Sequence, residues 1–373
     1  MQTGGIKIGR IFGIELWLDY SWFVLFFLIG LTFTAGLLPA QFPDLSPPAI
    51  LASGLLITLL FFVSIIIHEL SHSLYAKKQG LEIRRITLFI FGGASEVVED
   101  PKTPGQEFVL AAVGPLASFV LSLVFGAVWL AGEQVDYLPL IAIGSTLGIV
   151  NFALAVFNVL PGFPMDGGRM FRAAAWKLTG DMERATRYAA TGGKIFAFLL
   201  IFYGALQLLL GALLGGLWLI LIGFFLNQAA SYSYQQTMYR LLLKDVKVRD
   251  LMQRDFISVP RGATIRTFLQ KYVLRYKETT MPIEADKTHP AGLVDVKQLP
   301  EPENLNERVG KFTLKDVYTL QPQDEALKAL DIMNQSGLNK LPVADHGKLV
   351  GILTSGRVRA YLLGKHKLHD SEK

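Results

Sequence analysis

Cysteine is absent from this chain of 373 residues. Its absence excludes disulfide bonds, thiol chemistry and cysteine-ligated zinc, so any bound metal must be held by histidine, aspartate or glutamate. A long basic patch is also missing. The net charge is +5, yet the basic residues lie beside apolar segments. Membrane topology explains that distribution better than nucleic-acid binding does, so we expect no nucleic-acid partner.

Charge is missing altogether from residues 195–239. As one helix this stretch would be roughly 67 Å long, about twice the bilayer core, and the glycines near its middle indicate a hairpin between two spans. With 51% hydrophobic residues, the chain is too apolar for an ordinary soluble protein. We predict six transmembrane helices, at about residues 20–38, 49–72, 108–131, 137–160, 195–212 and 216–235.

The basic residues orient these predicted spans. Segments 73–107 and 167–194 contain lysine and arginine, whereas 39–48, 132–136 and 211–216 contain neither. The positive-inside rule then places both termini in the cytoplasm. We therefore predict a multi-pass protein of the cell membrane with cytoplasmic N- and C-termini.

An HExxH pattern occupies residues 68–72, directly after an uncharged run over residues 49–67. Positions four apart share one helix face, so His68 and His72 can present two imidazoles to one Zn²⁺, with Glu69 beside them as a general base. The pattern alone is weak, but ionisable groups at membrane depth usually mark function. The alternative is two interfacial histidines beside a snorkelling glutamate.

The fourth predicted span ends in a segment rich in glycine and proline. Pro161 and Pro164 stop the helix and leave Asp166 in a glycine-rich turn. The predicted topology puts Asp166 at the same cytoplasmic depth as the two histidines, so three candidate ligands converge from distant segments.

Two other segments near this depth have less specific patterns. Residues 81–98 have a β-like pattern, and a strand at membrane depth must be buried in protein or line a wet cavity. Such a strand could also pair with an unfolded substrate. In residues 114–118, Gly114 and Ser118 lie four apart, and that spacing alone favours close helix packing.

Beyond about residue 243 the hydropathy falls and an internal repeat of roughly 60 residues begins. One copy covers about 248–295 and the other about 314–354. Such a repeat packs as a pseudo-two-fold unit in which neither half buries its face alone. The predicted organisation is a transmembrane domain over 1–242 with a small membrane-associated β-sheet, followed by a cytoplasmic α/β domain over 243–373.

The chain resembles the site-2 protease family of intramembrane metalloproteases, in the subgroup with a C-terminal pair of CBS motifs. Residues 68–72 look like its HExxH motif, 158–167 like its Asn-x-x-Pro…Asp-Gly motif, and 114–118 like its Gly-x-x-x-Asn/Ser element. The fold implied is a polytopic α-helical membrane protein with a C-terminal CBS pair.

This resemblance also implies roles for individual residues. His68, His72 and Asp166 would bind one zinc ion, Glu69 would activate water, and Asn158 would hold the substrate carbonyl or the oxyanion. The strand around 85–91 and the 114–118 turn would receive the substrate as an added strand, which would unwind a transmembrane helix before cleavage. The implied substrate-binding residues are Arg85, Ile86, Leu88, Ile90, Gly114 and Ser118.

The function implied is zinc-dependent cleavage of single-span membrane proteins, known as regulated intramembrane proteolysis, modulated by the CBS pair. A CBS pair also implies an adenine nucleotide and a homodimer as partners. Gln298 and Arg357 stand where nucleotide-binding copies usually carry an aspartate that contacts ribose. Arg357 could instead meet phosphate.

Two other classes remain open at the level of sequence. A CBS-gated transporter or channel would predict polar residues along several spans, whereas the ionisable groups here cluster at one depth. A catalytically inactive scaffold would have no need for the carboxylate of Glu69.

Overall fold

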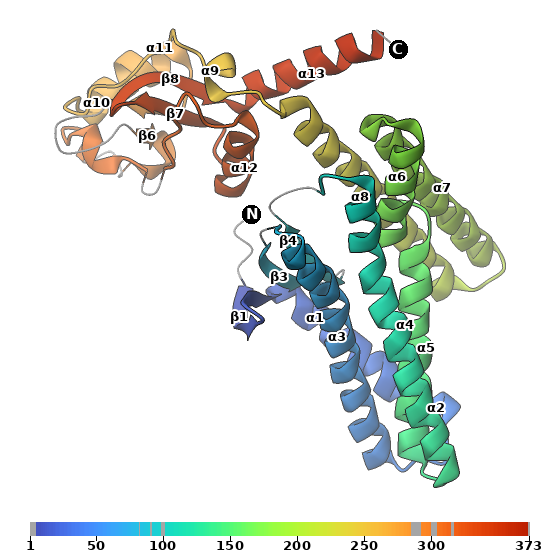
Figure 1. Cartoon of the computed structure of the whole chain (residues 1–373). Helices are drawn as coiled ribbons and strands as arrows, with labels where there is room; N and C mark the ends of the chain where they lie inside the picture. The colour runs from blue at the N-terminus through green and yellow to red at the C-terminus, as the bar shows by residue number, and fades with distance from the viewer. Residues whose placement is uncertain are drawn as a thin grey trace. The chain divides into compact units, whose positions relative to one another are not determined.

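A computed structural model of the chain describes residues 5–81, 83–89, 92–97, 101–284, 292–299, 304–314 and 317–371 (Figure 1). Residue contacts divide the chain into two units, which we call the membrane unit (Thr3–Thr237) and the C-terminal unit (Met238–Lys373). The division falls inside helix α8 (Leu213–Leu243), near the predicted boundary at residue 242.

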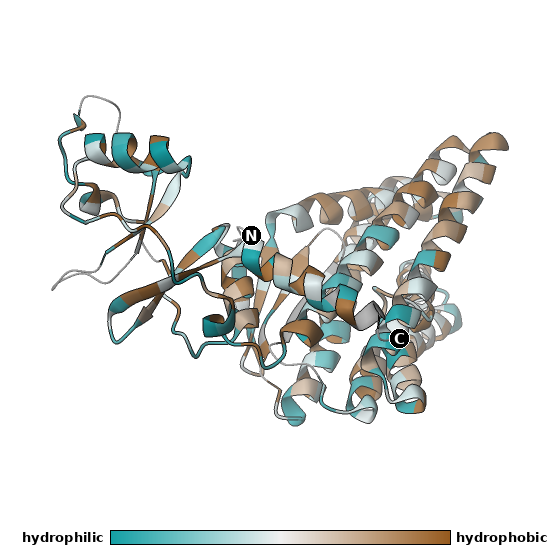
Figure 2. Ribbon diagram, turned by 90° about the horizontal axis from the view of Figure 1, so that it is seen from above, coloured by the Kyte–Doolittle hydropathy of each residue, from teal (hydrophilic) through white to brown (hydrophobic). Residues whose placement is uncertain are grey.

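The described residues contain six helices long and apolar enough to cross a membrane, which confirms the predicted number. The first crossing, Tyr20–Gln41, combines α1 (Tyr20–Leu31), the π-helix η1 (Thr32–Leu37) and α2 (Leu38–Gln41). The other five are α3 (Pro47–Lys78), α4 (Pro104–Gln134), α5 (Leu138–Val159), α7 (Met182–Leu209) and α8. Figure 2 shows the apolar residues along these helices in brown.

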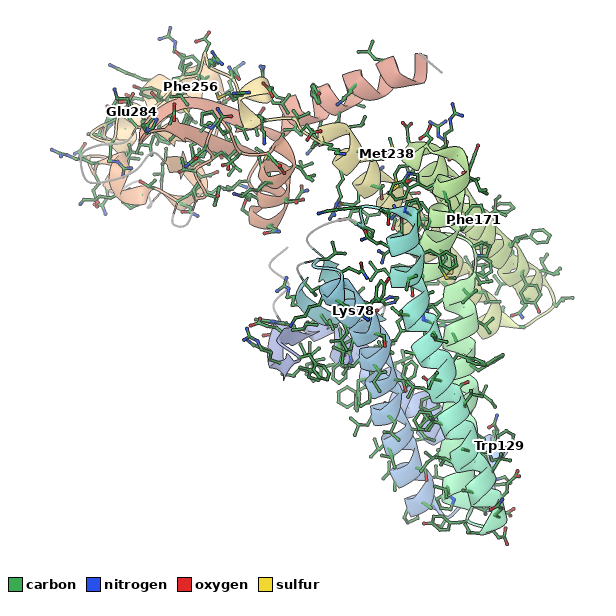
Figure 3. All side chains as sticks on the ribbon, in the orientation of Figure 1. Lys78, Trp129, Phe171, Met238, Phe256 and Glu284 are labelled. Carbon is green, nitrogen blue, oxygen red and sulfur yellow. The ribbon has the colours of Figure 1, made fainter. Side chains whose placement is uncertain are left out.

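Most of these helices extend beyond the predicted spans, and contacts at the ends of α3 and α7 show why. Helix α3 continues past His72 to Lys78, where Gly80 with a φ of +78° terminates it and Leu81 N–H donates to the Ala76 carbonyl. Helix α7 begins at Met182 because the Asp181 carboxylate accepts from two backbone N–H groups of its first turn. Figure 3 labels Lys78, at the end of α3, and Trp129, on α4.

A four-stranded sheet packs against α3 in the membrane unit, in the order β1-β2-β3-β4. Its strands are β1 (Gly5–Ile11), β2 (Ile14–Asp19), β3 (Ile83–Phe89) and β4 (Gly92–Val97). The β2–β3 pair is parallel and the other two pairs are antiparallel. Ile14, Leu16 and Ile86 form a buried cluster against α3 residues, so the sheet is fixed to the helix that carries the histidines.

The C-terminal unit contains two separate hairpins, one in each copy of the repeat. Strands β5 (Thr280–Ile283) and β6 (Gly292–Asp295) form the first, and β7 (Lys340–Asp345) and β8 (Lys348–Thr354) form the second. Besides the end of α8, the described residues of this unit form α9 (Val248–Leu251), α10 (Ile265–Thr267), η2 (Phe268–Val273), α11 (Leu274–Tyr276), η3 (Val296–Gln298), η5 (Val309–Phe312), α12 (Ala326–Ser336) and α13 (Ser355–Ser371).

The two copies of the repeat pair with each other reciprocally. Lys247 bridges Glu325, and Thr264 bridges Arg308. Lys247 and Arg308 occupy equivalent positions about 60 residues apart, as do Thr264 and Glu325. The segment that opens each copy therefore pairs with the helix start of the other, which is the pseudo-two-fold arrangement that the repeat predicts.

Candidate metal centre

Asp166 is the first residue of a helix, α6 (Asp166–Thr179), and not a turn residue as the sequence suggested. The chain makes a tight loop between the end of α5 at Val159 and this helix. A Cβ added to Gly167 would lie 2.2 Å from the Val159 carbonyl oxygen, and one on Gly168 would lie 2.3 Å from the Gly162 carbonyl carbon. Only glycine at these two positions allows the backbone to approach closely enough to present Asp166.

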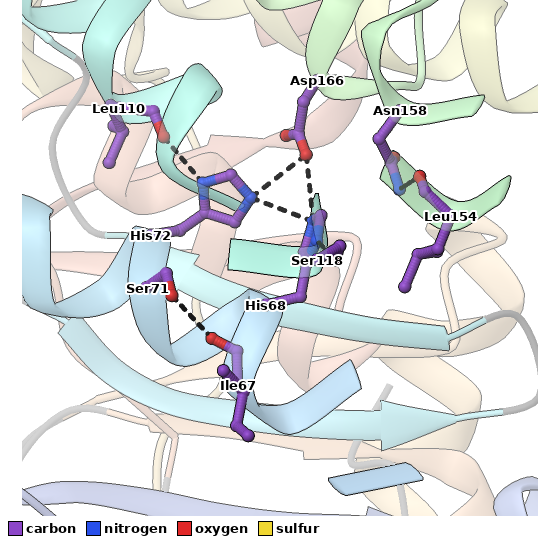
Figure 4. Close-up of polar contacts among 9 residues, drawn as sticks. All are labelled: Ile67, His68, Ser71, His72, Leu110, Ser118, Leu154, Asn158 and Asp166. Carbon is purple, nitrogen blue, oxygen red and sulfur yellow. Dashed lines mark hydrogen bonds and ion pairs between the residues drawn. The ribbon is translucent and has the colours of Figure 1, made fainter. Parts of the chain in front are cut away.

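Three side chains converge at one point between α3 and α6 (Figure 4). Asp166 Oδ2 lies 3.1 Å from His68 Nε2 and 3.1 Å from His72 Nε2, and the two Nε2 atoms are 3.2 Å apart. The histidines are 5% and 7% exposed. The structure thus brings together the three residues predicted as metal ligands.

Hydrogen bonds from the far side of each ring orient the two histidines. His72 Nδ1 lies 2.6 Å from the Leu110 carbonyl oxygen, which can only accept, so Nδ1 carries the proton. His68 Nδ1 lies 2.9 Å from the Ser118 hydroxyl. Such partners fix the ring orientation and the tautomer of metal-ligating histidines, and they leave Nε2 directed at the centre.

The donor set fits a zinc ion. Ligand atoms about 2.0–2.1 Å from a tetrahedral zinc ion lie about 3.3 Å from each other, close to the observed separations. The convergence of two imidazole nitrogens and a carboxylate oxygen requires a cation among them, either a proton or a metal ion. Gly114 keeps that space open, because a Cβ there would lie 2.1 Å from His72 Nε2 and 2.7 Å from His68 Nε2.

The electrostatics of Asp166 favour its ionised form. Burial by itself would raise the pKa of the carboxyl, but the bonds to His68 and His72 and their charge hold the pKa below its usual range. Asp166 is therefore a carboxylate at neutral pH, which is the form that binds a metal.

Glu69 lies beside this centre and against the edge of the sheet. A Cβ added to Gly93 would lie 2.4 Å from Glu69 Cγ, so the β4 backbone contacts this side chain directly. Glu69 is half-buried on α3, next to His68. A general base at this position could reach a water molecule held at the centre.

The structure corrects the predicted route for a substrate strand. Strand β3, which carries Arg85 to Leu88, pairs with β2 on one side and β4 on the other, so neither of its edges is open. Ile86 and Leu88 are 0% and 2% exposed, because their side chains pack in the core. The guanidinium carbon of Arg85 lies 5.6 Å from the centre of the Trp17 ring. Ile90 lies outside the described residues.

The contacts of Gly114 and Ser118 differ from the substrate contacts predicted for them. Gly114 faces both Nε2 atoms of the histidines, and Ser118 Oγ contacts His68 Nδ1. Their spacing of four places both on the same face of α4. Sequence reasoning did not find the Leu110 carbonyl as the partner of His72, because a backbone carbonyl leaves no signature in the residue type.

Asn158 stands apart from the three converging side chains. Its Nδ2 donates to the Leu154 carbonyl of its own helix at 3.0 Å, and Figure 4 shows this bond to one side of Asp166. The side chain is half-buried. Nδ2 carries two hydrogens, so a role at the substrate carbonyl would use its second N–H while the bond to Leu154 is kept.

Comparisons with known proteins identify the chain. The model of Peptidase family M50 matches residues 56–135 and 130–202, and the CBS domain model matches residues 309–364. The protein sll0528 of Synechocystis sp., named as a proposed zinc metalloprotease, is 32% identical over 366 residues, which cover 96% of this chain and 95% of that protein.

A further relative agrees with this result, and one solved structure is similar to part of the chain. Rip3 of Mycobacterium tuberculosis, also named as a proposed zinc metalloprotease, is 32% identical over 98% of this chain and 95% of its own length. The solved site-2 protease of Methanocaldococcus jannaschii is 29% identical, with a TM-score of 0.44, and covers 62% of this chain and 95% of that one.

The protein is a multi-pass membrane metalloprotease with a C-terminal CBS domain, and its cofactor is zinc. The chain belongs to peptidase family M50, the site-2 protease family. Membership in this family decides against the transporter, and the zinc metalloproteases among its full-length relatives decide for the protease over the inactive scaffold.

Proposed function

We propose that this enzyme cleaves peptide bonds in the transmembrane segments of single-span membrane proteins, close to the cytoplasmic face. The observation that carries the proposal is the position of the three converging side chains. His68 and His72 lie on the membrane-crossing helix α3. Asp166 is the first residue of α6, which follows the membrane-crossing helix α5. Basic residues flank these helix ends, which supports cytoplasmic termini and a centre near the cytoplasmic boundary.

In this proposal each residue of the centre has one role. His68, His72 and Asp166 hold the metal, and a bound zinc ion supplies Lewis-acid chemistry by acidifying water and polarising a carbonyl. Glu69 accepts the proton of the attacking water on its carboxylate and returns it to the leaving amine. Asn158 donates from Nδ2 to the oxygen of the scissile carbonyl, where negative charge develops.

The substrate would bind as an additional strand on the outer edge of β4. This edge replaces β3 in the earlier prediction, because both edges of β3 are paired. The contact between Gly93 and Glu69 supports the choice, since a strand added to β4 would lie close to the general base. Strand addition holds the peptide extended and exposes a bond that a helix would shield.

The C-terminal unit would regulate the protease by binding an adenine nucleotide and by forming a homodimer. Arg357 Nε donates to the Leu251 carbonyl at 2.8 Å, so a phosphate would meet the other guanidinium nitrogens. Gln298 is exposed at the end of η3 and is available to a ligand. Nucleotide-dependent cleavage by the full chain would test this part of the proposal.

Zinc content and cleavage, measured together, test the proposed centre. In detergent-purified protein we expect one zinc per chain, lost in His72→Ala and Asp166→Ala but retained in Glu69→Gln. His346→Ala is the control, because His346 lies exposed in the β7–β8 turn of the C-terminal unit. On a single-span test substrate, Glu69→Gln should lose activity by at least about 100-fold. Zinc retained in Asp166→Ala would refute the ligand set, and cleavage retained in Glu69→Gln would refute the role of the base.

A further inference from the structure

A buried ion pair joins helices α4 and α6 close to the metal centre. Arg172 Nε donates to Glu107 Oε1 at 2.6 Å, and a second guanidinium nitrogen contacts the same oxygen. Glu107 is 0% exposed and Arg172 is 6% exposed. Such a pair adds little net stability compared with apolar side chains of similar size. Its presence therefore suggests a requirement for defined geometry.

This ion pair connects the helix that orients His72 with the helix that carries Asp166. Glu107 lies one helical turn before Leu110, whose carbonyl fixes the ring of His72. Arg172 lies on α6, the helix that begins with Asp166. A change in the distance between α4 and α6 would move the Asp166 carboxylate relative to His72 Nε2.

Arg172 also contacts the loop before Asp166 and helix α8. Its guanidinium carbon lies 5.2 Å from the centre of the Phe163 ring, and its Nη1 donates to Thr237 Oγ1 at 3.2 Å. Phe163 is itself held by a bond from its N–H to the Ala189 carbonyl. The planar fork of a guanidinium can make these contacts together, whereas the single ammonium of lysine cannot.

We propose that Arg172 is a positioning residue that sets the affinity of the zinc site by holding Asp166 in place against the two histidines. The proposal rests on the ligand set of the proposed function. Glu107 serves as the anchor on α4. Among the described residues its Oε2 has no hydrogen-bond partner, so the charge of Glu107 is compensated through Oε1 by Arg172.

The test is zinc affinity of the full-length protein in detergent, measured by competition with a chelator of known affinity. Arg172→Lys keeps a positive charge near Glu107 but removes the planar guanidinium group. We expect zinc to bind about 10-fold to 100-fold more weakly, the range found when the hydrogen-bond partners of metal ligands are changed. The visible spectrum of the cobalt-substituted protein should change as well, because it reports ligand geometry. A purely structural role would leave that spectrum unchanged.

Arg187→Lys is the matched control, because Arg187 pairs with Glu183 within helix α7. Its zinc affinity should stay within about twofold of the wild type. The proposal is overturned if Arg172→Lys retains wild-type affinity and cobalt spectrum, or if Arg187→Lys loses as much affinity. Zinc retained in His72→Ala or Asp166→Ala would instead refute the proposed ligand set, so the two failures are distinguishable.

Two further variants test the proposal if Arg172→Lys does not fold. Glu107→Gln combined with Arg172→Gln removes both buried charges and should show the same loss of affinity. Thr237→Val removes only the hydroxyl that accepts from Arg172, and we expect a loss of about threefold to tenfold, below the range for the arginine itself. If both Arg172 variants fail to fold and Thr237→Val binds zinc like the wild type, Arg172 serves folding alone and the proposal is wrong.

Discussion

The two halves of the metal centre reach the same point in different ways. His68 and His72 are four positions apart on one helix, so α-helical geometry alone places their side chains together. Asp166 is 98 positions from His68, and its place depends on a tight loop, two glycines and the packing of α6 on α4. The histidine half is therefore local and rigid, whereas the aspartate half depends on long-range contacts.

This contrast predicts where substitutions will do most damage. Changes that fill the space of the centre should act on both halves at once. Changes to residues that position Asp166 should weaken one ligand and leave the histidine pair intact. Changes to the hydrogen-bond partner of a single histidine should reduce zinc binding least.

The largest effect is expected for Gly114→Ala. Its Cβ would lie 2.1 Å from His72 Nε2, where it would displace the ring and occupy space the metal needs. We expect elemental analysis to find less than one zinc per chain, and a substrate assay to find no cleavage. Gly126→Ala, on the same helix with nothing within 4 Å of the added Cβ, is the control and should retain zinc. Full zinc occupancy in Gly114→Ala would mean that the metal lies elsewhere.

An intermediate effect is expected for Gly167→Ala. The added Cβ would lie 2.2 Å from the Val159 carbonyl oxygen, so the loop must shift and carry Asp166 away. We expect zinc affinity to fall on the order of 100-fold, the upper end of the range for changes behind a ligand, while weak binding to the histidines persists. Chelator competition measures this. An affinity equal to that of the wild type would show that the aspartate half is as rigid as the histidine half.

Among these three variants, the smallest effect is expected for Ser118→Ala. The variant removes the hydroxyl 2.9 Å from His68 Nδ1 but leaves both Nε2 atoms and Asp166 in place. We expect zinc affinity about tenfold lower, at the low end of the range for such partners. Ser71→Ala is a suitable control, because Ser71 Oγ donates to the Ile67 carbonyl of its own helix. Equal losses in both variants would argue against a specific role for Ser118.

Much of the fold was predictable because it follows from local composition. The six apolar helices come from uncharged runs long enough to cross a bilayer, and the repeat in the C-terminal unit follows from a period of about 60 residues. The extension of α3 to Lys78 was missed, since the predicted span stopped at the histidines while the helix itself continues until Gly80. Hydropathy reports where a helix leaves the membrane and not where it ends.

The contacts within the sheet and behind the ligands were not predictable in the same way. Strand β3 has a β pattern, but whether it is an edge or an interior strand depends on β2, which comes from a distant part of the chain. The roles of Gly114 and Ser118 toward the histidines likewise depend on how α4 packs on α3.

The sequence by itself determined the six membrane helices, the histidine pair with Glu69, the candidacy of Asp166 and the C-terminal repeat. These follow from periodicity, hydropathy and residue chemistry, which act over a few helical turns. The tertiary structure alone decided that β4 is an edge of the sheet, that Leu110 and Ser118 orient the histidines, and that Arg172 links α6 to α4. Those features depend on close packing between segments far apart in the chain, and no local pattern encodes them.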